Sequence, residues 1–188
     1  MSLYSFLFLS SLNSFFNTLT NYDDHKIIKK KLKAASSQIK DLYIDEVNSR
    51  VYVDTGPVLE RAYASISGLG WIGKNSCLIN RDQGSWIFLS NILIDQELAF
   101  DNLPSKNLCG SCTKCIDSCP TNAIVDDKVV DARKCISYLT IENKKYVNND
   151  LAHKIGNNIY GCDICQEVCP WNKRATISEL NQFHPRDD

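Results

Sequence analysis

Apolar residues recur at helical spacing over residues 25–40, with lysines between them. The apolar positions of this segment are Ile27, Ile28, Leu32, Ala35 and Ile39. A stripe with this period predicts an amphipathic helix, and Asp23 and Asp24 can cap its amino end. The lysines are expected to lie in solvent, and contact with phosphate groups is the alternative role for this face.

A short β-branched run at residues 50–54 predicts a strand. Residues 55–57 follow as a turn, with Pro57 at the favoured first position of a second helix. Gly68 is expected to stop that helix. Asp54 then lies where a strand ends and a helix begins, a place where side chains often point into a ligand crevice, although an aspartate there can also simply stabilise the turn.

Three glycines surround a tryptophan in residues 68–75. A loop this rich in glycine lets another backbone or a flat group approach closely, but it lacks the order of a phosphate-binding loop. The next two apolar runs, 77–80 and 85–89, are expected to pair as a hairpin through residues 81–84. Cys77, at the start of the first run, is expected to be a small buried apolar residue with no ligand role.

After the middle of the chain, the pattern of hydrophobic and polar residues is less regular. Residues 120–131 predict a loop with a short strand, and Asp131 is expected to cap a helix over residues 132–139. A further helix is expected over residues 149–155, ending at Gly156. Helices and strands thus mix along the chain, which indicates the α+β class.

The composition is that of a globular protein, with 188 residues, of which 44% are hydrophobic and 23% charged, and a net charge of −1. A chain of this length forms one domain or two small ones. The near-neutral balance does not favour nucleic acid as a partner of the whole surface, although a local basic stretch can still bind a polyanion.

The amino end begins with a short apolar burst at residues 3–9. The burst is too short to span a bilayer, and no basic residue precedes it as one would in a signal peptide. Residues 1–20 are expected to form a packed helix or an irregular start, with no membrane contact. The reduced thiols described next favour a cytoplasmic location.

Nine cysteines carry the clearest chemistry. Residues 109–120 have the spacing C-x2-C-x2-C-x3-C-P of bacterial ferredoxins with two 4Fe–4S clusters, in which the fourth cysteine binds the other cluster. Residues 162–170 repeat the tail of this run, and Cys135 can replace the missing first cysteine. One cluster is then expected to bind Cys109, Cys112, Cys115 and Cys169. The other is expected to bind Cys119, Cys135, Cys162 and Cys165.

Zinc and disulfide bonds are the alternative uses of these thiols. Tetrahedral zinc takes four ligands, usually as two pairs, so a triple at three-residue steps followed by Cys-Pro supplies too many. A disulfide scaffold is typical of small secreted chains in an oxidising compartment. The doubled spacing therefore favours two iron–sulfur clusters, with Cys77 outside them.

Three further motifs accompany the cysteine runs, at residues 54–61 (DTGPVLER), 68–75 (GLGWIGKN) and 131–142 (DARKCISYLTIE). In this order, and together with both cysteine runs, they resemble the epoxyqueuosine reductases. The resemblance covers residues 22–186. About a hundred residues precede the first cysteine, more than an electron carrier needs, and they are expected to bind whatever receives the electrons.

The resemblance implies a cobalamin-dependent oxidoreductase that removes the epoxide oxygen of epoxyqueuosine at the wobble position of tRNA, giving queuosine. It implies that two 4Fe–4S clusters pass electrons from an external donor to cobalamin, with Asp54 as the proton donor. The residues expected to contact the corrin are Asp54, Arg61, Ser137, Cys162 and Asp163. A carboxyl group serves as the acid if burial raises its pKa. A monomer is expected, with tRNA as the substrate.

These expectations divide the chain into four parts. Residues 1–20 have no counterpart in the resemblance, residues 21–103 form part of a cobalamin- and substrate-binding domain, residues 104–175 form a ferredoxin-like module with two 4Fe–4S clusters, and residues 176–188 form a polar tail. The fold class is α+β, a mixed α/β part followed by that module.

The family has further segments at both ends, so the chain is expected to be truncated. A ferredoxin-like electron carrier without a corrinoid, and a relative that reduces another substrate, are the alternatives.

Overall fold

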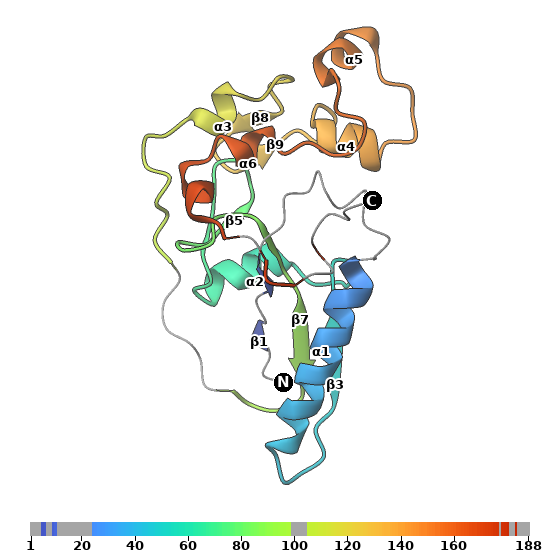
Figure 1. Ribbon diagram of the computed structural model, residues 1–188, viewed down its shortest axis with the longest axis vertical. Coiled ribbons are helices and arrows are strands. Elements are labelled where there is room, and N and C mark those ends of the chain that lie inside the picture. Colours follow the sequence, from blue (N-terminus) through green and yellow to red (C-terminus); the bar gives the residue numbers. More distant parts are fainter. Residues whose placement is uncertain are drawn as a thin grey trace.

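The computed structural model describes residues 5–6, 9–10, 24–98, 105–176, 178–180 and 183. Its first half is built on a small antiparallel sheet with the strand order β1-β7-β3. The three strands are β1 (Ser5–Phe6), β3 (Ser49–Tyr52) and β7 (Asn91–Ile94). Helix α1 (Asp24–Asp41) packs on β3 and β7, as Figure 1 shows.

Helix α1 confirms the amphipathic pattern, with bounds one residue outside the expected 25–40. Its apolar stripe enters the main core, whereas most of its lysines are exposed. The buried residues of that core are Ile28, Leu32, Val47, Val53, Ile92, Ile94 and Phe183. Full burial of a side chain such as Leu32 stabilises the fold by roughly 1.5–3 kcal/mol, so this stripe anchors the helix on the sheet.

Phe183 lies in the segment that was expected to be a polar tail, yet its side chain is only 1% exposed. Its ring stacks on that of Phe88, with the ring centroids 5.9 Å apart. Leu180 packs against the same core. The described end of the chain is therefore part of the core of the first half.

The hairpin expected between residues 77–80 and 85–89 is limited to one antiparallel bridge, between Asn80 and Gly84, because beyond it the two runs pair with different strands. The strands concerned are β2 (Leu9–Ser10), β4 (Trp71–Ile72), β5 (Leu78–Ile79) and β6 (Ile87–Phe88). Strand β5 pairs with β4, and β6 pairs with β2. The glycine-dense segment before β5 thus forms one side of a small hairpin.

Side-chain hydrogen bonds explain why the chain leaves β5 in a new direction. The Asn80 side chain accepts the backbone N–H groups of Asp82 and Gln83, which closes a tight turn. The N–H of Ser85 then donates to Oδ1 of Asn172 at 2.6 Å. This long-range bond draws the second run away from β5 and toward the C-terminal half.

Two other features of the first half differ from what was expected. The described positions among residues 1–20 form β1 and β2, which excludes a packed helix at these positions but not the irregular start that was the alternative. Helix α2 (Glu60–Ile66) begins three residues after Pro57. The delay follows from Asp54, whose φ of 58° turns the chain into a left-handed bend before the helix. Gly68, with a φ of 81°, ends α2 as expected.

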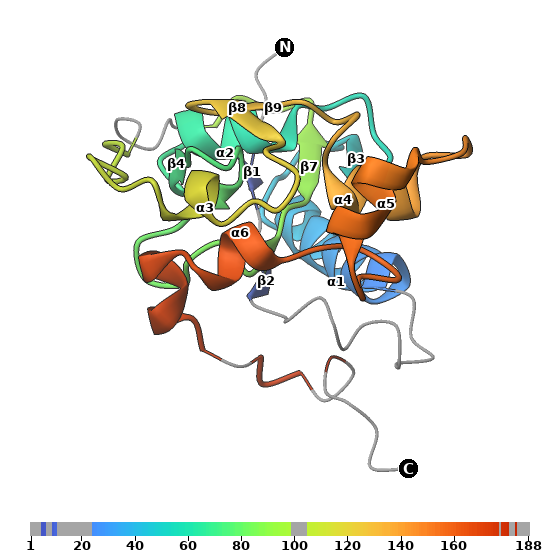
Figure 2. The same cartoon turned by 90° about the horizontal axis from the view of Figure 1, so that it is seen from above.

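The second half contains two cysteine loops, each followed by a short helix. Its elements are α3 (Lys114–Asp117), β8 (Ile124–Asp126), β9 (Val129–Val130), α4 (Ile136–Ile141), α5 (Asn149–Ile155), α6 (Ile164–Glu167) and η2 (Pro170–Arg174). Helices α3 and α6 lie side by side (Figures 1 and 2). Helix α5 has the expected bounds, and the Asn148 side chain caps it by accepting the N–H of Leu151 at 2.9 Å.

Helix α4 corrects the expectation for residues 132–139, because it begins at Ile136. Asp131 stabilises a turn instead of capping a helix. Its carbonyl accepts the N–H of Cys135, and its carboxylate accepts two hydrogen bonds of 2.9 Å from the Arg133 guanidinium, which lower the pKa of Asp131. This turn leaves Cys135 at the N-cap of α4, just ahead of the helix.

Among the described residues, none of the helices combines the length and the hydropathy that crossing a bilayer needs.

The packing of Phe183 predicts a large effect of its removal. Phe183→Ala should lower the free energy of unfolding by about 3–5 kcal/mol, because it leaves a cavity in the main core. Thermal or denaturant unfolding of the cluster-loaded protein measures this. Ile159→Ala is the matched control, since that side chain is 91% exposed and should change stability by less than about 0.5 kcal/mol. Equal stabilities of the two variants would contradict the packing.

Candidate functional site

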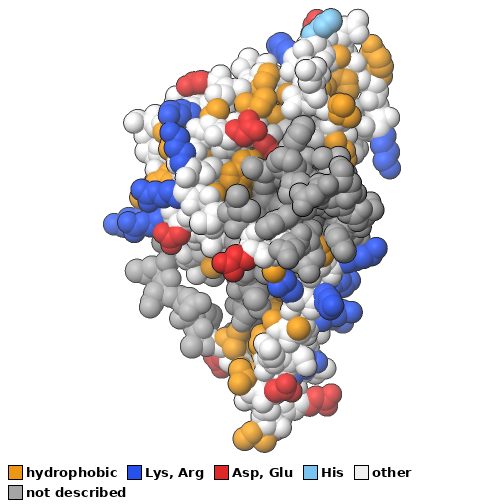
Figure 3. Space-filling model, viewed as in Figure 1, with side chains coloured by type: hydrophobic (Ala, Val, Ile, Leu, Met, Phe, Trp, Pro, Cys, Tyr) orange, Lys and Arg blue, Asp and Glu red, His pale blue; other side chains and the backbone are white. Residues whose placement is uncertain are grey.

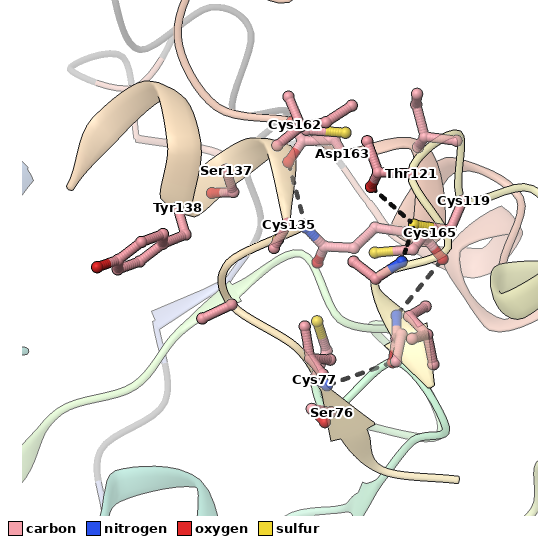
Figure 4. Close-up of a pocket in the computed structure, with 18 of the residues that line it drawn as sticks. Ser76, Cys77, Cys119, Thr121, Cys135, Ser137, Tyr138, Cys162, Asp163 and Cys165 are labelled. Carbon is pink, nitrogen blue, oxygen red and sulfur yellow. Dashed lines mark hydrogen bonds between the residues drawn. The ribbon is translucent and has the colours of Figure 1, made fainter. Parts of the chain in front are cut away.

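Cysteines line two of the cavities formed by the described residues. The smaller one, called the first cavity below, has a volume of about 250 Å³, and its thiols are Cys109, Cys112, Cys115 and Cys169. The larger one, called the second cavity, has a volume of about 800 Å³, and its thiols are Cys77, Cys119, Cys135, Cys162 and Cys165 (Figure 4). The structure thus gathers each predicted cysteine set in a cavity of its own. Their role as iron ligands stays a prediction.

The two short helices α3 and α6 account for this division. Each follows the loop of one cysteine run, and the last cysteine of the run comes just after the helix. Cys119 of the first run therefore reaches the second cavity, and Cys169 of the second run reaches the first. The Cys119 N–H donates to the Ile116 carbonyl at 3.2 Å, and the Cys169 N–H donates to that of Gln166 at 3.0 Å. This crossing is what the two-cluster spacing requires.

Aromatic side chains border the first cavity. Trp71 is only 3% exposed, and its indole N–H donates to Sγ of Cys109 at 3.4 Å. Trp171 packs edge-on against Trp71, with the ring centroids 5.0 Å apart. Burial raises the pKa of Cys115 to about 11 and also raises the pKa of Cys169. Both thiols must lose a proton before they bind a metal.

Neighbouring groups shift the pKa values of the thiols in the second cavity, some upward and some downward. Burial alone would raise the pKa of Cys119, but hydrogen bonds from the Ala123 N–H, at 3.2 Å, and from Thr121 outweigh it and lower that pKa. The side-chain hydrogen bond between Cys77 and Cys165 lowers the pKa of Cys77 and raises that of Cys165. Cys77 therefore contacts a predicted ligand, a position that its place in an apolar run did not indicate.

Four of the five residues expected at the corrin line the second cavity, namely Arg61, Ser137, Cys162 and Asp163. Ser137 lies in the first turn of α4, and Asp163 is the N-cap of α6 (Figure 4). Arg61, from α2, donates to the Ser76 carbonyl at 2.5 Å, which fixes its guanidinium at the wall. Cysteine thiols and polar side chains from both halves of the chain thus share one cavity.

Asp54, the fifth of these residues, lies in a neighbouring cavity of about 380 Å³ that shares Arg61 with the second cavity. Oδ2 of Asp54 is 3.3 Å from Nε2 of His25. The Asp54 side chain is 79% exposed, so this conformation lacks the burial that was expected for a catalytic acid. The structure brings Asp54 next to the second cavity without enclosing it.

Three neighbours of these cavities were missed from the sequence: His25, Trp71 and Asn75. Asn75 is buried and lines both the first and the second cavity. Its Nδ2 donates to the Cys165 carbonyl at 3.4 Å, and its Oδ1 accepts the Cys77 N–H at 3.2 Å. The glycine-dense motif was the available signal for Trp71 and Asn75, because it indicated close approach of another part of the chain.

Known proteins match both halves of the chain. Residues 108–172 match the family described as a 4Fe–4S double cluster binding domain. The epoxyqueuosine reductase of Cyclobacterium marinum is 48% identical over 166 residues, which are 88% of this chain and 53% of that protein. A crystal structure of epoxyqueuosine reductase with an epoxyqueuosine-modified tRNA stem loop has a TM-score of 0.82 and 33% identity, covering 90% of this chain and 44% of the other. The structure of epoxyqueuosine reductase from Bacillus subtilis has a TM-score of 0.83 and 29% identity. The match covers 96% of this chain and 50% of the other.

The chain belongs to the epoxyqueuosine reductase family. It spans about half the length of the curated epoxyqueuosine reductases it matches. The family confirms the α+β class with an iron–sulfur module, and the matched double-cluster domain contains all eight cysteines predicted as ligands, with Cys77 outside it. Within the described ranges, no three cysteine, histidine or acidic side chains are placed to hold a single metal ion.

The division of thiols predicts a selective loss of iron in this member of the epoxyqueuosine reductase family. Cys135→Ser should remove the cluster of the second cavity and spare most of the other, because the first cavity contains no part of the turn that carries Cys135. Iron analysis of anaerobically reconstituted protein should then fall from roughly eight to roughly four atoms per chain.

Cys77→Ser is the matched control, because Cys77 lines the same cavity but has no predicted ligand role. Iron content should stay close to that of the unmodified chain. Loss of four iron atoms from the Cys77→Ser protein, or of all iron from the Cys135→Ser protein, would show that the ligands are paired differently.

Proposed function

We propose that this chain is the part of an epoxyqueuosine reductase that carries electrons through two 4Fe–4S clusters to cobalamin, and that it reduces epoxyqueuosine to queuosine at the wobble position of tRNA. The lining of the second cavity is the main support for this proposal. There the predicted ligands of one cluster and the polar residues expected at the corrin line the same space of about 800 Å³. A volume of this order suits a cofactor site, and the shared wall would keep electron carrier and acceptor close together.

The proposed order of electron transfer follows from which cavity borders which group. The second cavity contains both thiols and corrin-contact residues, so its cluster would be the one next to cobalamin. The first cavity is lined by thiols, apolar groups and lysines, and its cluster would receive electrons from an external donor. Asn75 borders both cavities, so the path between the two clusters is short and passes through buried protein.

Cobalamin, when bound, supplies the cobalt redox chemistry that protein side chains lack. The donor set of the second cavity suits such a group. Arg61 offers N–H donors, Ser137 a hydroxyl and Asp163 a carboxylate, while apolar side chains such as Ile136 and Ile141 line the same cavity. The polar residues would bind the amide and phosphate edge of a corrinoid, and the apolar ones would exclude water from its face.

Asp54 is the proposed proton donor. Opening an epoxide leaves negative charge on oxygen, and a positioned carboxylic acid lowers the barrier by giving up its proton. His25, at 3.3 Å, would orient the carboxyl group and return a proton to it. The Bacillus subtilis structure is described with its aspartate catalytic loop swung out of the active site, and the exposed Asp54, on a left-handed bend, supports a similar open position here.

The tRNA would meet a basic surface beside this acid. A related structure contains a tRNA stem loop. Here the exposed lysines of α1 follow directly after His25, and Figure 3 shows basic side chains gathered along that helix. Lys26 and Lys29 lie within about 6 Å of His25 along the helix axis at 1.5 Å per residue, so they would contact phosphates close to the reacting nucleoside.

The proposed domains are the cofactor- and substrate-binding part at residues 21–103 and the two-cluster module at residues 104–175. The protein would work as a monomer in the cytoplasm, where a reducing environment keeps the cysteines available for iron.

Cobalamin binding separates this function from that of a simple electron carrier. Anaerobically reconstituted protein incubated with cobalamin and then desalted should show corrin absorption in addition to the broad cluster band. Arg61→Ala should weaken corrin retention roughly tenfold or more while the cluster band stays unchanged, because it removes a charged donor at the cavity wall. A cluster band alone, with no retained corrin, would contradict the reductase and favour a ferredoxin-like carrier.

Asp54→Asn tests the acid directly. The amide keeps the size of the side chain but cannot donate a carboxylic proton, so queuosine formation on epoxyqueuosine-containing tRNA should fall by about 100-fold or more. Iron and cobalamin content should not change. Asp45→Asn, at an exposed position just beyond α1, is the matched control and should keep full activity. Normal turnover by the Asp54→Asn protein would exclude the proposed role.

A further inference from the structure

The β4–β5 hairpin contacts both cysteine-lined cavities. Trp71 in β4 and Ile79 in β5 pack with Cys169 in a small core beside the first cavity. Cys77, just before β5, lines the second cavity, and Asn75 in the turn lines both. The hairpin belongs to the first half of the chain and precedes every predicted cluster ligand. Residues outside the two-cluster module are therefore part of the surroundings of both clusters.

Trp71 makes a specific polar contact with Cys109, one of the thiols that line the first cavity. Its indole N–H donates to Sγ of Cys109 at 3.4 Å, and an indole has this one donor and no acceptor. The ring is buried, and Trp171 lies edge-on against it at an interplanar angle of 78°. The Arg174 guanidinium lies 5.5 Å from the Trp171 ring. These contacts fix the direction in which the N–H of Trp71 points.

Close backbone packing holds the hairpin in place. A side chain at Gly70 would collide with the Ile79 carbonyl, and a Cβ at Gly73 would lie 2.8 Å from Oδ1 of Asn75. The Lys74 carbonyl accepts a backbone hydrogen bond of 3.0 Å from the β8–β9 turn, and the Lys74 side chain pairs with Asp127 at 3.4 Å. The position of Trp71 relative to Cys109 is thus set by contacts on both strands and on the turn.

We propose that Trp71 is a positioning residue that raises the reduction potential of the cluster in the first cavity. The inference rests on the proposed cluster binding at that cavity. Reduction adds one electron to a cluster and increases the negative charge on its thiolate sulfurs. The Trp71 N–H then stabilises the reduced form more than the oxidised form, because it acts on Sγ of Cys109 in a buried site.

The consequence concerns how electrons enter the protein. The cluster of the first cavity is the one that receives electrons from the donor, and the hydrogen bond makes it easier to reduce. The residue responsible lies outside the two-cluster module, so the cofactor-binding part of the chain sets the potential at the point of entry. Trp71 acts through Cys109 and touches neither substrate nor corrin.

A redox titration followed by electron paramagnetic resonance tests this with the full chain, without cobalamin or tRNA. In the Trp71→Phe protein both clusters should be present, with roughly eight iron atoms per chain. One reduction wave should move to lower potential by about 59 mV, a tenfold change in the ratio of oxidised to reduced cluster, and the other wave should not move.

Trp86→Phe is the matched control, because Trp86 is buried but lines neither cysteine-lined cavity, and the contact to Cys109 comes from Trp71. Its reduction waves should stay close to those of the unmodified chain. Equal shifts in the two variants, or no shift in the Trp71→Phe protein with full iron content, would overturn the role of Trp71 and leave the proposed function intact. A chain that assembles no clusters at all would instead refute the proposed function.

A second measurement uses the unmodified sequence and does not depend on how the variant folds. In protein grown with tryptophan labelled with ¹⁵N at the indole nitrogen, pulsed electron paramagnetic resonance of the reduced first cluster should detect a weakly coupled ¹⁵N nucleus. The Trp86→Phe protein should keep this coupling. Absence of any tryptophan coupling to the reduced cluster would overturn the inference.

Discussion

The crossing of the two cysteine runs is the constraint on which the rest of the structure depends. Helices α3 and α6 lie side by side, and each is followed by a cysteine that lines the cavity of the other run. Neither cavity can be completed by one run alone, since Cys119 and Cys169 exchange sides. Metal binding at either cavity would therefore stabilise the pairing of both runs, in the way that bound metals couple to folding in small domains.

The first half of the chain is tied to this crossing through polar contacts as well as by sequence. Asn172 accepts the Ser85 N–H at 2.6 Å and donates to the Gln166 carbonyl at 2.7 Å, so one side chain connects the end of the second cysteine run to the loop before β6. Asn75, in the β4–β5 turn, also connects the first half to the second cysteine run, because its Nδ2 donates to the Cys165 carbonyl at 3.4 Å. These contacts hold the two halves of the chain together beside the two cysteine-lined cavities.

Local patterns in the sequence were sufficient for some of these features and insufficient for others. The helices at 25–40 and 149–155 follow from spacing over a few residues, which is decided locally, whereas the two cysteine sets were predicted from the two-cluster spacing, which prescribes the crossing of distant runs. The pairing of β6 with β2, the late start of α4 and the contact of Trp71 with Cys109 depend on residues distant in the chain or on competing turn hydrogen bonds. Asp54 was located by a motif, but its exposure and its contact with His25 depend on tertiary structure.

Metal analysis and Mössbauer spectroscopy of the chain purified without oxygen measure the crossed arrangement most directly. Two complete sites of four thiolates each predict about eight iron and eight sulfide per chain, all in 4Fe–4S clusters. Roughly four iron atoms per chain, or zinc bound in place of iron, would contradict it.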